Sequence, residues 1–317
     1  MPRVALTKLG EVLAVMLAVS FLVYLVLEAN AADVAVKVLG QYSMPEQRTL
    51  WLHENGYDQP FFVRYFVWLG HFVTGDWGKS SLFRERVSVI LLPRLGRTGI
   101  LAGLTFAVMV PMSFVLGIAA GVREGSGVDR VISFLCVVTT SVPEFASCVF
   151  FSAIFVFALG WLPGASTMLS GFAWRELVLP VAVLAVFDIG YVARITRSSM
   201  AEVMTQPYVR TAMMKGASPA RVVFRHALRN ALVAPVTVIM LQVPWLLSGV
   251  IVVEVFFAYK GFGTLLYEAS LNSDVALIEA CAMISVFVIV ITQLLSDLIY
   301  GLLNPRIKLF GLREAAA

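Results

Sequence analysis

Residues 207–232, PYVRTAMMKGASPARVVFRHALRNAL, form a basic, helix-forming segment between two hydrophobic stretches of the chain. Pro207 suits the first turn of a helix, and Gly216 suits a left-handed helix end. Ser218 and Pro219 suit the N-cap and the first turn of a new helix. The segment therefore predicts two short helices that meet at a bend around Gly216.

The side chains of this segment favour a protein contact. A purely solvated surface would not need Met213 and Met214 beside a glycine bend, and several basic residues decorate the same segment. These basic residues are Arg210, Lys215, Arg221, Arg225 and Arg229. We expect a membrane protein with such a segment to take its driving force from a soluble partner.

The composition places the rest of the chain in a lipid bilayer. Apolar residues make up 59% of the chain, charged residues only 14%, and the mean hydropathy is +0.86. Stretches long enough to cross the hydrocarbon, which takes about 20 helical residues, begin near Leu9, Ile100, Val131, Leu177, Leu232 and Val275. The ten-residue alternation typical of a β-barrel is missing from the sequence. We predict an all-α polytopic membrane protein with six transmembrane helices.

The distribution of basic residues predicts the orientation. Fourteen lysines and arginines fall in the segments that lie inside if the N-terminus is cytoplasmic, whereas the short outer loops hold only Arg175 and Lys260. Because positive charge marks cytoplasmic loops, we expect both termini in the cytoplasm. The net charge of +4 is then a topology signal, and a nucleic-acid surface is the less favoured interpretation.

The first span has features of a cleavable signal peptide, because Arg3 and Lys8 precede an apolar run that ends before a small-residue triplet, Ala29–Ala31. The apolar run is long for a signal sequence, so we expect a permanent helix. The predicted division is residues 1–28 for the N-terminal segment and first helix, 29–98 for an external subdomain, 99–303 for a five-helix core that includes a cytoplasmic loop at 194–231, and 304–317 for a cytoplasmic tail.

The external region predicts two helices. Ser43 and Glu46 have the spacing of a capping box, which would open a helix ending at Gly56. A second helix is expected from about Pro60, where aromatic residues recur at spacings of three and four. Its aromatic face would lie either at the outer membrane interface or against the ends of the spans, and the sequence leaves both open.

Catalytic and metal-binding motifs are missing from the sequence. Gly78-Lys79-Ser80 resembles the end of a phosphate-binding loop, but Val73 occupies the position of the required first glycine. The three cysteines and three histidines are scattered, and the sequence contains no HExxH pattern. We expect no catalytic residue, no metal site, no cofactor bound by this chain, and no enzyme activity of its own.

Two groups of intramembrane residues stand out. Gly99 and Gly103, with Gly117 and Gly121, form two GxxxG pairs on one helix face, which predicts close helix packing. Carboxylates occur near the middle of the third span and within the fourth, fifth and sixth spans. Four polar residues are candidates for a translocation path: Glu144, Asp188, Gln242 and Glu254.

A structural role competes with transport for each of these carboxylates. A carboxylate at the bilayer centre costs about 2.5–3.5 kcal/mol on insertion scales, so Glu144 should face a cavity or another helix. We expect an ion pair between Asp188 and Arg194 or Arg197 near the membrane interface. Glu254 and Asp297 lie close to opposite faces of the membrane.

The longest motifs resemble a known family, the permease subunits of bacterial ABC importers for dipeptides, oligopeptides and nickel. Residues 193–232, ARITRSSMAEVMTQPYVRTAMMKGASPARVVFRHALRNAL, are similar to the family motifs RLTRSSMLEVL, YVRTARAKG and HALRNAL. The similarity continues in GYDQPFFVRYFVWLGHFVTGDWGKS, SVPEF, LGWLP and SDLIYGLLNPRI, so it covers nearly the whole chain.

The resemblance implies the type I ABC importer permease fold and a coupling helix that docks in a groove of an ATPase subunit. The residues it assigns to ATPase coupling are Arg210, Thr211, Ala212, Lys215, Gly216, Ala217 and Ser218. The implied partners are a second, homologous permease, two cytoplasmic ATPase subunits that carry ATP and magnesium, an external solute-binding protein and membrane lipid, with no nucleic acid.

Three departures from the family pattern concern the outer side. Residues 28–33 replace Pro-Gly-Asp-Pro, residues 259–261 replace Trp-Pro-Gly, and residues 273–276 replace Arg-Asp-Tyr-Pro. The cargo therefore stays open between dipeptide, oligopeptide, nickel and another solute. The alternative function is an ion-coupled secondary transporter or channel that uses the intramembrane carboxylates.

Overall fold

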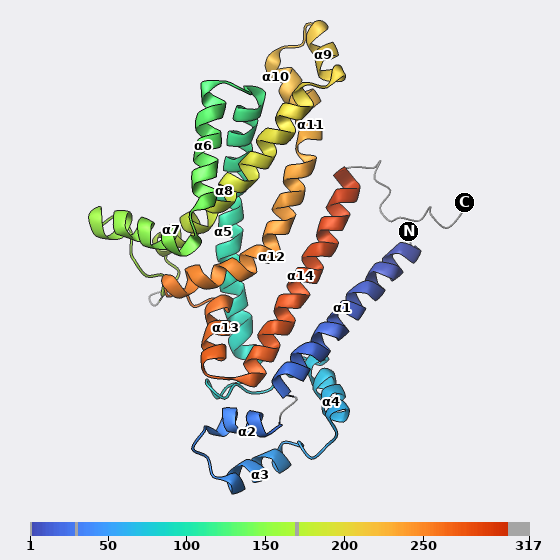
Figure 1. Cartoon of the computed structure of the whole chain (residues 1–317), viewed down its shortest axis with the longest axis vertical. Helices are drawn as coiled ribbons and strands as arrows, with labels where there is room; N and C mark the ends of the chain where they lie inside the picture. Colours follow the sequence, from blue (N-terminus) through green and yellow to red (C-terminus); the bar gives the residue numbers. More distant parts are fainter. Residues whose placement is uncertain (1, 29–30, 169–170, 304–317) are drawn as a thin grey trace. The chain divides into compact units, whose positions relative to one another are not determined.

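The computed structural model describes residues 2–28, 31–168 and 171–303, and this part of the chain is mainly helical (Figure 1). The helices before the third span are α1 (Pro2–Glu28), α2 (Ala31–Leu39), α3 (Pro45–Glu54), α4 (Phe61–Val73) and α5 (Val87–Val122). Those that follow are α6 (Gly127–Ser141), α7 (Glu144–Phe151), η1 (Ser152–Ala158), α8 (Trp174–Met204), α9 (Pro207–Met214), α10 (Pro219–Arg221), η2 (Val222–Ala227), α11 (Leu228–Ala231), α12 (Val233–Phe256), α13 (Phe262–Leu271) and α14 (Val275–Leu303).

The six predicted spans appear as four continuous helices and two bent pairs. Four helices in the described part of the chain are long and apolar enough to cross a membrane: α1, α5, α8 and α14. The third span consists of α6 and of α7 with η1, bent by 103°, and the fifth is α12, which follows residues 219–231 after a bend of 49°. Counting each bent pair as one span gives six.

The bend in the third span lies immediately before Glu144. Val142 is extended (φ −90°, ψ 123°) and Pro143 follows with φ −60° and ψ 147°. A proline disfavours helical backbone at the residue before it and removes a backbone donor. The helix therefore stops at Ser141, and Glu144 opens α7.

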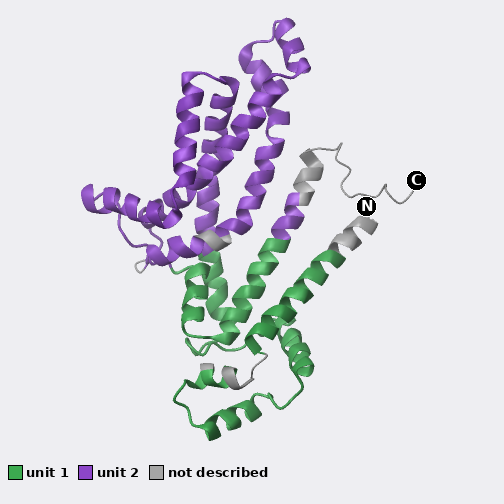
Figure 2. Cartoon of the chain, in the orientation of Figure 1, with its two compact units in different colours: residues 1–97, 260–290 green, residues 98–259, 291–317 purple. Residues whose placement is uncertain are grey.

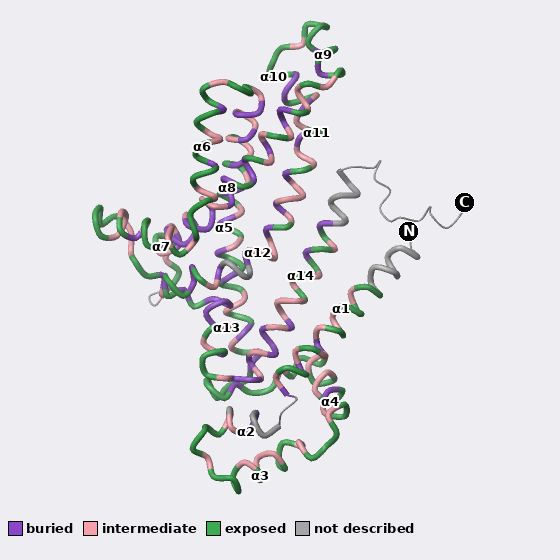
Figure 3. Tube along the Cα trace, in the orientation of Figure 1, coloured by how far each residue is buried: buried purple, intermediate pink, exposed green. Residues whose placement is uncertain are grey.

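The chain forms two compact units (Figure 2). Unit 1 consists of residues 1–97 and 260–290, and unit 2 of residues 98–259 and 291–317. The core of unit 1 gathers Val87, Leu91, Phe262, Leu265 and Leu277. In unit 2, α8 is the central helix, since 61% of the residues in its most apolar 18-residue stretch are buried (Figure 3).

The external region of unit 1 corrects one expected helix start and confirms the second helix. Helix α3 is preceded by Met44, whose backbone N–H donates to Gln47 Oε1 at 3.1 Å, whereas Ser43 Oγ donates to the Gly40 carbonyl. Helix α4 has the predicted aromatic face, and this face packs on α1: the ring of Tyr65 lies 5.6 Å from that of Tyr24. The structure thus agrees with packing against a span.

Only the second glycine pair makes a close helix contact. A Cβ atom at Gly117 would lie 2.7 Å from the Ala193 carbonyl oxygen, and one at Gly121 would lie 2.7 Å from that of Arg197. Helix α5 therefore touches the backbone of α8 at these positions. At Gly99 and Gly103 a Cβ atom would meet nothing within 4 Å among the described residues, so the prediction is wrong for the first pair.

Candidate functional site

The basic segment folds as its sequence predicts. Pro207 occupies the first turn of α9, and the helix ends at a bend where Gly216 has a φ of +81°. Glycine is the residue that adopts this left-handed conformation without steric cost. Ser218 precedes Pro219 at the start of α10, and the Val222 N–H donates to the Ser218 carbonyl at 2.9 Å.

The segment has a small apolar core of its own. Val209 and Val222 are fully buried, and Ala212 is only 9% exposed. They pack with Met200, Val223, Ala227 and Ala231. Ala212 therefore holds the two short helices together and is not part of the outer surface of the bend.

The outer surface of the bend combines methionines with positive charge. Met213 is 47% exposed, Met214 is 80% exposed, and Phe224 is 70% exposed. Of the predicted coupling residues, Arg210, Thr211, Lys215, Gly216 and Ser218 are exposed, Ala217 is half-buried and Ala212 is buried. Phe224 was not among the predicted contact residues, although an aromatic residue between Val223 and Arg225 in a basic segment was a usable sequence signal.

One side-chain hydrogen bond fastens the bent segment to α8, and another joins its two ends. Ser199 Oγ on α8 donates to the Ala231 carbonyl at 2.8 Å. Within the segment, Asn230 Nδ2 donates to the Tyr208 hydroxyl at 2.9 Å. The first bond ties the end of the segment to α8, and the second ties the start of the segment to its end.

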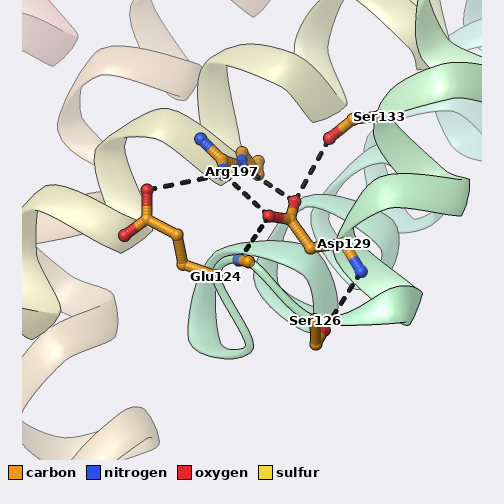
Figure 4. A network of polar contacts seen from close by, with 6 residues as sticks. Glu124, Ser126, Asp129, Ser133 and Arg197 are labelled. Atoms are coloured by element: carbon orange, nitrogen blue, oxygen red, sulfur yellow. Dashed lines mark hydrogen bonds and ion pairs between the residues drawn. The ribbon is translucent and has the colours of Figure 1, made fainter.

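Two residues before Ser199, Arg197 joins α8 to the start of α6 and to the turn that precedes it, in a charged network (Figure 4). Arg197 donates to the Asp129 carboxylate through Nε at 2.9 Å and through Nη2 at 2.7 Å. The same guanidinium lies 3.4 Å from Glu124. Asp129 also accepts from the Gly125 N–H and from Ser133 Oγ. A bidentate pair of this kind is strong and geometrically specific.

This network corrects the expected partner of Asp188. Gln242 Nε2 on α12 donates to Asp188 Oδ1 at 2.5 Å, while Arg197 bonds Asp129. Asp188 is fully buried, and its Oδ2 has no hydrogen-bond partner among the described residues. The pair lies where α8 packs against α12.

Glu144 belongs to the same neighbourhood. Helix α7 packs against both α8 and α12, and the Glu144 carboxylate is near enough to repel that of Asp188. Its Oε1 is buried without a hydrogen-bond partner in the described part of the chain. Three of the four translocation-path candidates, Glu144, Asp188 and Gln242, are thus brought together.

The fourth candidate lies elsewhere. Glu254 is fully buried and accepts a hydrogen bond from Thr98 Oγ1 at 2.5 Å. Twelve helical residues separate it from Gln242, about 18 Å along α12. The side chain of Asp297 lies outside the described residues. Among the described residues no group of three or more histidine, cysteine, aspartate or glutamate side chains could hold a metal ion.

The sequence and the fold are both similar to known transporter subunits. A family model described as "Binding-protein-dependent transport system inner membrane component" matches residues 113–309. The chain is 35% identical, over 97% of its length and 99% of the relative, to a Brucella abortus (strain 2308) protein provisionally named a peptide transport system permease. It is 30% identical to the oligopeptide transport system permease protein AppB of Bacillus subtilis (strain 168), over 93% of this chain and 95% of that protein.

A solved structure has a similar fold. A chain from the MetNI methionine ABC transporter in inward-facing conformations superposes with a TM-score of 0.50 and 16% sequence identity. The match covers 66% of this chain and 92% of that chain. The predicted importer-permease architecture is therefore confirmed at the level of the fold.

Proposed function

This chain belongs to the family of binding-protein-dependent transport system inner membrane components, and we propose that it forms part of the translocation path for peptides or a related small solute. It is a multi-pass inner membrane protein and a permease subunit of an ABC importer. Members of this family work with ATPase and solute-binding partners. We assign to this complex a second homologous permease, two ATPase subunits that supply ATP and magnesium, and an external binding protein.

The observation that carries the proposed coupling step is the bent segment at residues 207–231. Its surface offers exposed Met213 and Met214 at a bend flanked by positive charge, which suits a groove in a soluble protein. In this proposal the bend lies in the cytoplasm, docks on an ATPase subunit and moves when the ATPases close on ATP. The movement shifts the spans between inward and outward opening, a change of population between two states.

The test is Gly216→Val in the assembled complex in proteoliposomes, with ATP-driven dipeptide uptake as the readout. A side chain in left-handed backbone costs about 1–2 kcal/mol, so the bend should change shape while the spans still insert. Gly160→Val is the matched control, because Gly160 also has a positive φ (63°) with free space around it and lies outside the segment.

We expect Gly216→Val to lose uptake and Gly160→Val to keep it. Wild-type uptake by Gly216→Val would refute the coupling assignment. Uptake that survives ATP depletion and collapses with an uncoupler would instead identify the ion-coupled alternative.

A further inference from the structure

We propose that unit 1 contains a binding site for a ligand ammonium group, in a cavity walled by Glu28 and Glu279. The cavity has a volume of about 420 Å³, within the range typical of ligand pockets. Its lining includes Glu28, Trp51, Asn55, Tyr57, Asp274 and Glu279. All these residues belong to one compact unit, and neither the proposed coupling step nor the intramembrane polar cluster uses them.

Two buried carboxylates meet in this cavity. The side chain of Glu28 ends α1 and is 7% exposed, and that of Glu279 lies in the second turn of α14 and is 5% exposed. They are close enough to repel each other. Burying an ionised carboxylate is costly unless a positive charge or hydrogen bonds compensate it.

The negative charge of Glu28 is compensated by residues of the protein itself. Arg64 Nη1 lies 3.3 Å from Glu28 Oε2, and the hydroxyl of Tyr57 hydrogen-bonds the same carboxylate. Burial and the nearby Glu28 raise the pKa of Tyr57 above its ordinary value, so this hydroxyl keeps its proton and remains a donor.

The carboxylate of Glu279 has fewer compensating contacts than that of Glu28. The indole of Trp68 donates to its carboxylate, but Oε1 is buried with no hydrogen-bond partner among the described residues. The third acid of the cavity, Asp274, accepts from Ser80 Oγ at 2.5 Å and from the Leu82 N–H at 3.1 Å. The lysine of the lining, Lys79, is exposed. An acceptor on Glu279 is therefore left for a bound cation.

Two residues of the lining, Tyr57 and Glu28, already contact an organic cation next to the cavity. The Arg64 guanidinium lies 4.5 Å from the centre of the Tyr57 ring while it pairs with Glu28. Carboxylate on one side and an aromatic face on the other is the environment that favours organic cations. The Trp51 ring, 5.4 Å from that of Tyr57, extends this aromatic wall. An ammonium group beside Glu279 would use the same chemistry, with N–H donors directed at its carboxylate.

The proposed function indicates where such an ammonium comes from, and the inference rests on it in this one respect. A peptide cargo carries an α-ammonium group at its N-terminus. The cavity lies beside the 29–98 region, which the charge distribution places outside the membrane. We therefore assign the cavity to the amino end of an incoming peptide.

The experiment is calorimetric binding of alanyl-phenylalanine and of its N-acetyl derivative to the assembled complex in nanodiscs. The free-amine dipeptide should bind at least about tenfold more tightly than the acetylated one, the loss that one charge-assisted contact explains. Glu279→Gln should remove this difference. Glu268→Gln is the matched control, because Glu268 is a carboxylate of the same unit that lies 3.7 Å from Arg94 and outside the lining of this cavity.

Equal binding of the two dipeptides to the wild type would overturn the site, and so would equal discrimination by Glu279→Gln. A more stable Glu279→Gln together with no discrimination by the wild type would show that Glu279 simply holds a proton. If Glu279→Gln does not assemble, the comparison of the two dipeptides on the wild type still decides. ATP-driven dipeptide uptake without any discrimination would reject this site and leave the proposed function intact.

Discussion

Replacing Asp129 by asparagine removes the charge at the centre of the network in Figure 4 while keeping the size of the side chain. The Asp129 side chain is 5% exposed and accepts both bonds of the Arg197 guanidinium. Asparagine offers one acceptor oxygen and turns an NH₂ group toward a donor. We expect Asp129→Asn to weaken the attachment of α8 to the start of α6.

The magnitude follows from the burial of the two partners. Removing one partner of a buried pair costs about 3–5 kcal/mol. The Arg197 side chain is 29% exposed and keeps Glu124 as a second partner at 3.4 Å, so solvent and Glu124 recover part of this loss. We therefore expect the free energy of unfolding to fall by about 2–4 kcal/mol.

The assay is denaturant unfolding of the purified protein in detergent micelles, followed by helical circular dichroism. Glu124→Gln is the control, because the Glu124 side chain is 55% exposed and surface pairs contribute about 0–1 kcal/mol. An Asp129→Asn protein that unfolds within 0.5 kcal/mol, roughly the scatter among surface substitutions, of Glu124→Gln would refute the reasoning. Such a result would mean that the network adds little to the packing of α8.

Two further predictions concern the packing and the polar pair of unit 2. Gly121→Leu should lower the free energy of unfolding by several kcal/mol, since its Cβ would meet the backbone of α8 at 2.7 Å. Gly103→Leu, which has open space around it, should change the free energy of unfolding by about 0.5 kcal/mol or less. Equal losses for the two variants in the same unfolding assay would contradict the packing assignment. Asp188→Asn should leave stability within about 1 kcal/mol, because asparagine has nearly the same size and keeps an acceptor for Gln242. A loss of dipeptide uptake with unchanged stability would place Asp188 in the transport path, and unchanged uptake would give it a structural role alone.

Local backbone rules explain why the bent segment could be predicted residue by residue. The first-turn proline, the left-handed Gly216 and the Ser218–Pro219 start each depend on the dihedral angles of one or two residues. These preferences act without regard to distant parts of the fold. The exposed surface of the bend followed for the same reason, except for Ala212, whose burial depends on how the two short helices pack.

The partner of Asp188 could not be predicted in this way, because it depends on which helix faces meet. Gln242 is 54 positions away and Asp129 is 68 positions from Arg197. Helix phase could nevertheless have excluded the pair between Asp188 and Arg197. Nine residues turn a helix by about 900°, or two and a half turns, so Arg197 points to the opposite side of α8 from Asp188.

Helical phase alone could not show which of the two glycine pairs contacts another helix. The pairs begin 18 residues apart, which puts them on one face but about 27 Å apart along α5. Two helices that cross at an angle stay in backbone contact over only a few turns. Helix α8 meets α5 at Gly117 and Gly121, and the first pair lies beyond that crossing.

Helix α8 has a part in the proposed mechanism because its two opposite faces contact different helices. One side of the helix holds Arg197 against Asp129, and the other holds Asp188 against Gln242 on α12. Ser199, 11 residues or about 16 Å beyond Asp188, fastens the bent segment to the same helix. A displaced bend must therefore move α8 together with the start of α6, to which Arg197 is bonded. The reason is that bending a buried helix would break packed contacts. In the proposed importer the displacement then reaches the membrane interior where α8 meets α12, at the hydrogen bond between Asp188 and Gln242.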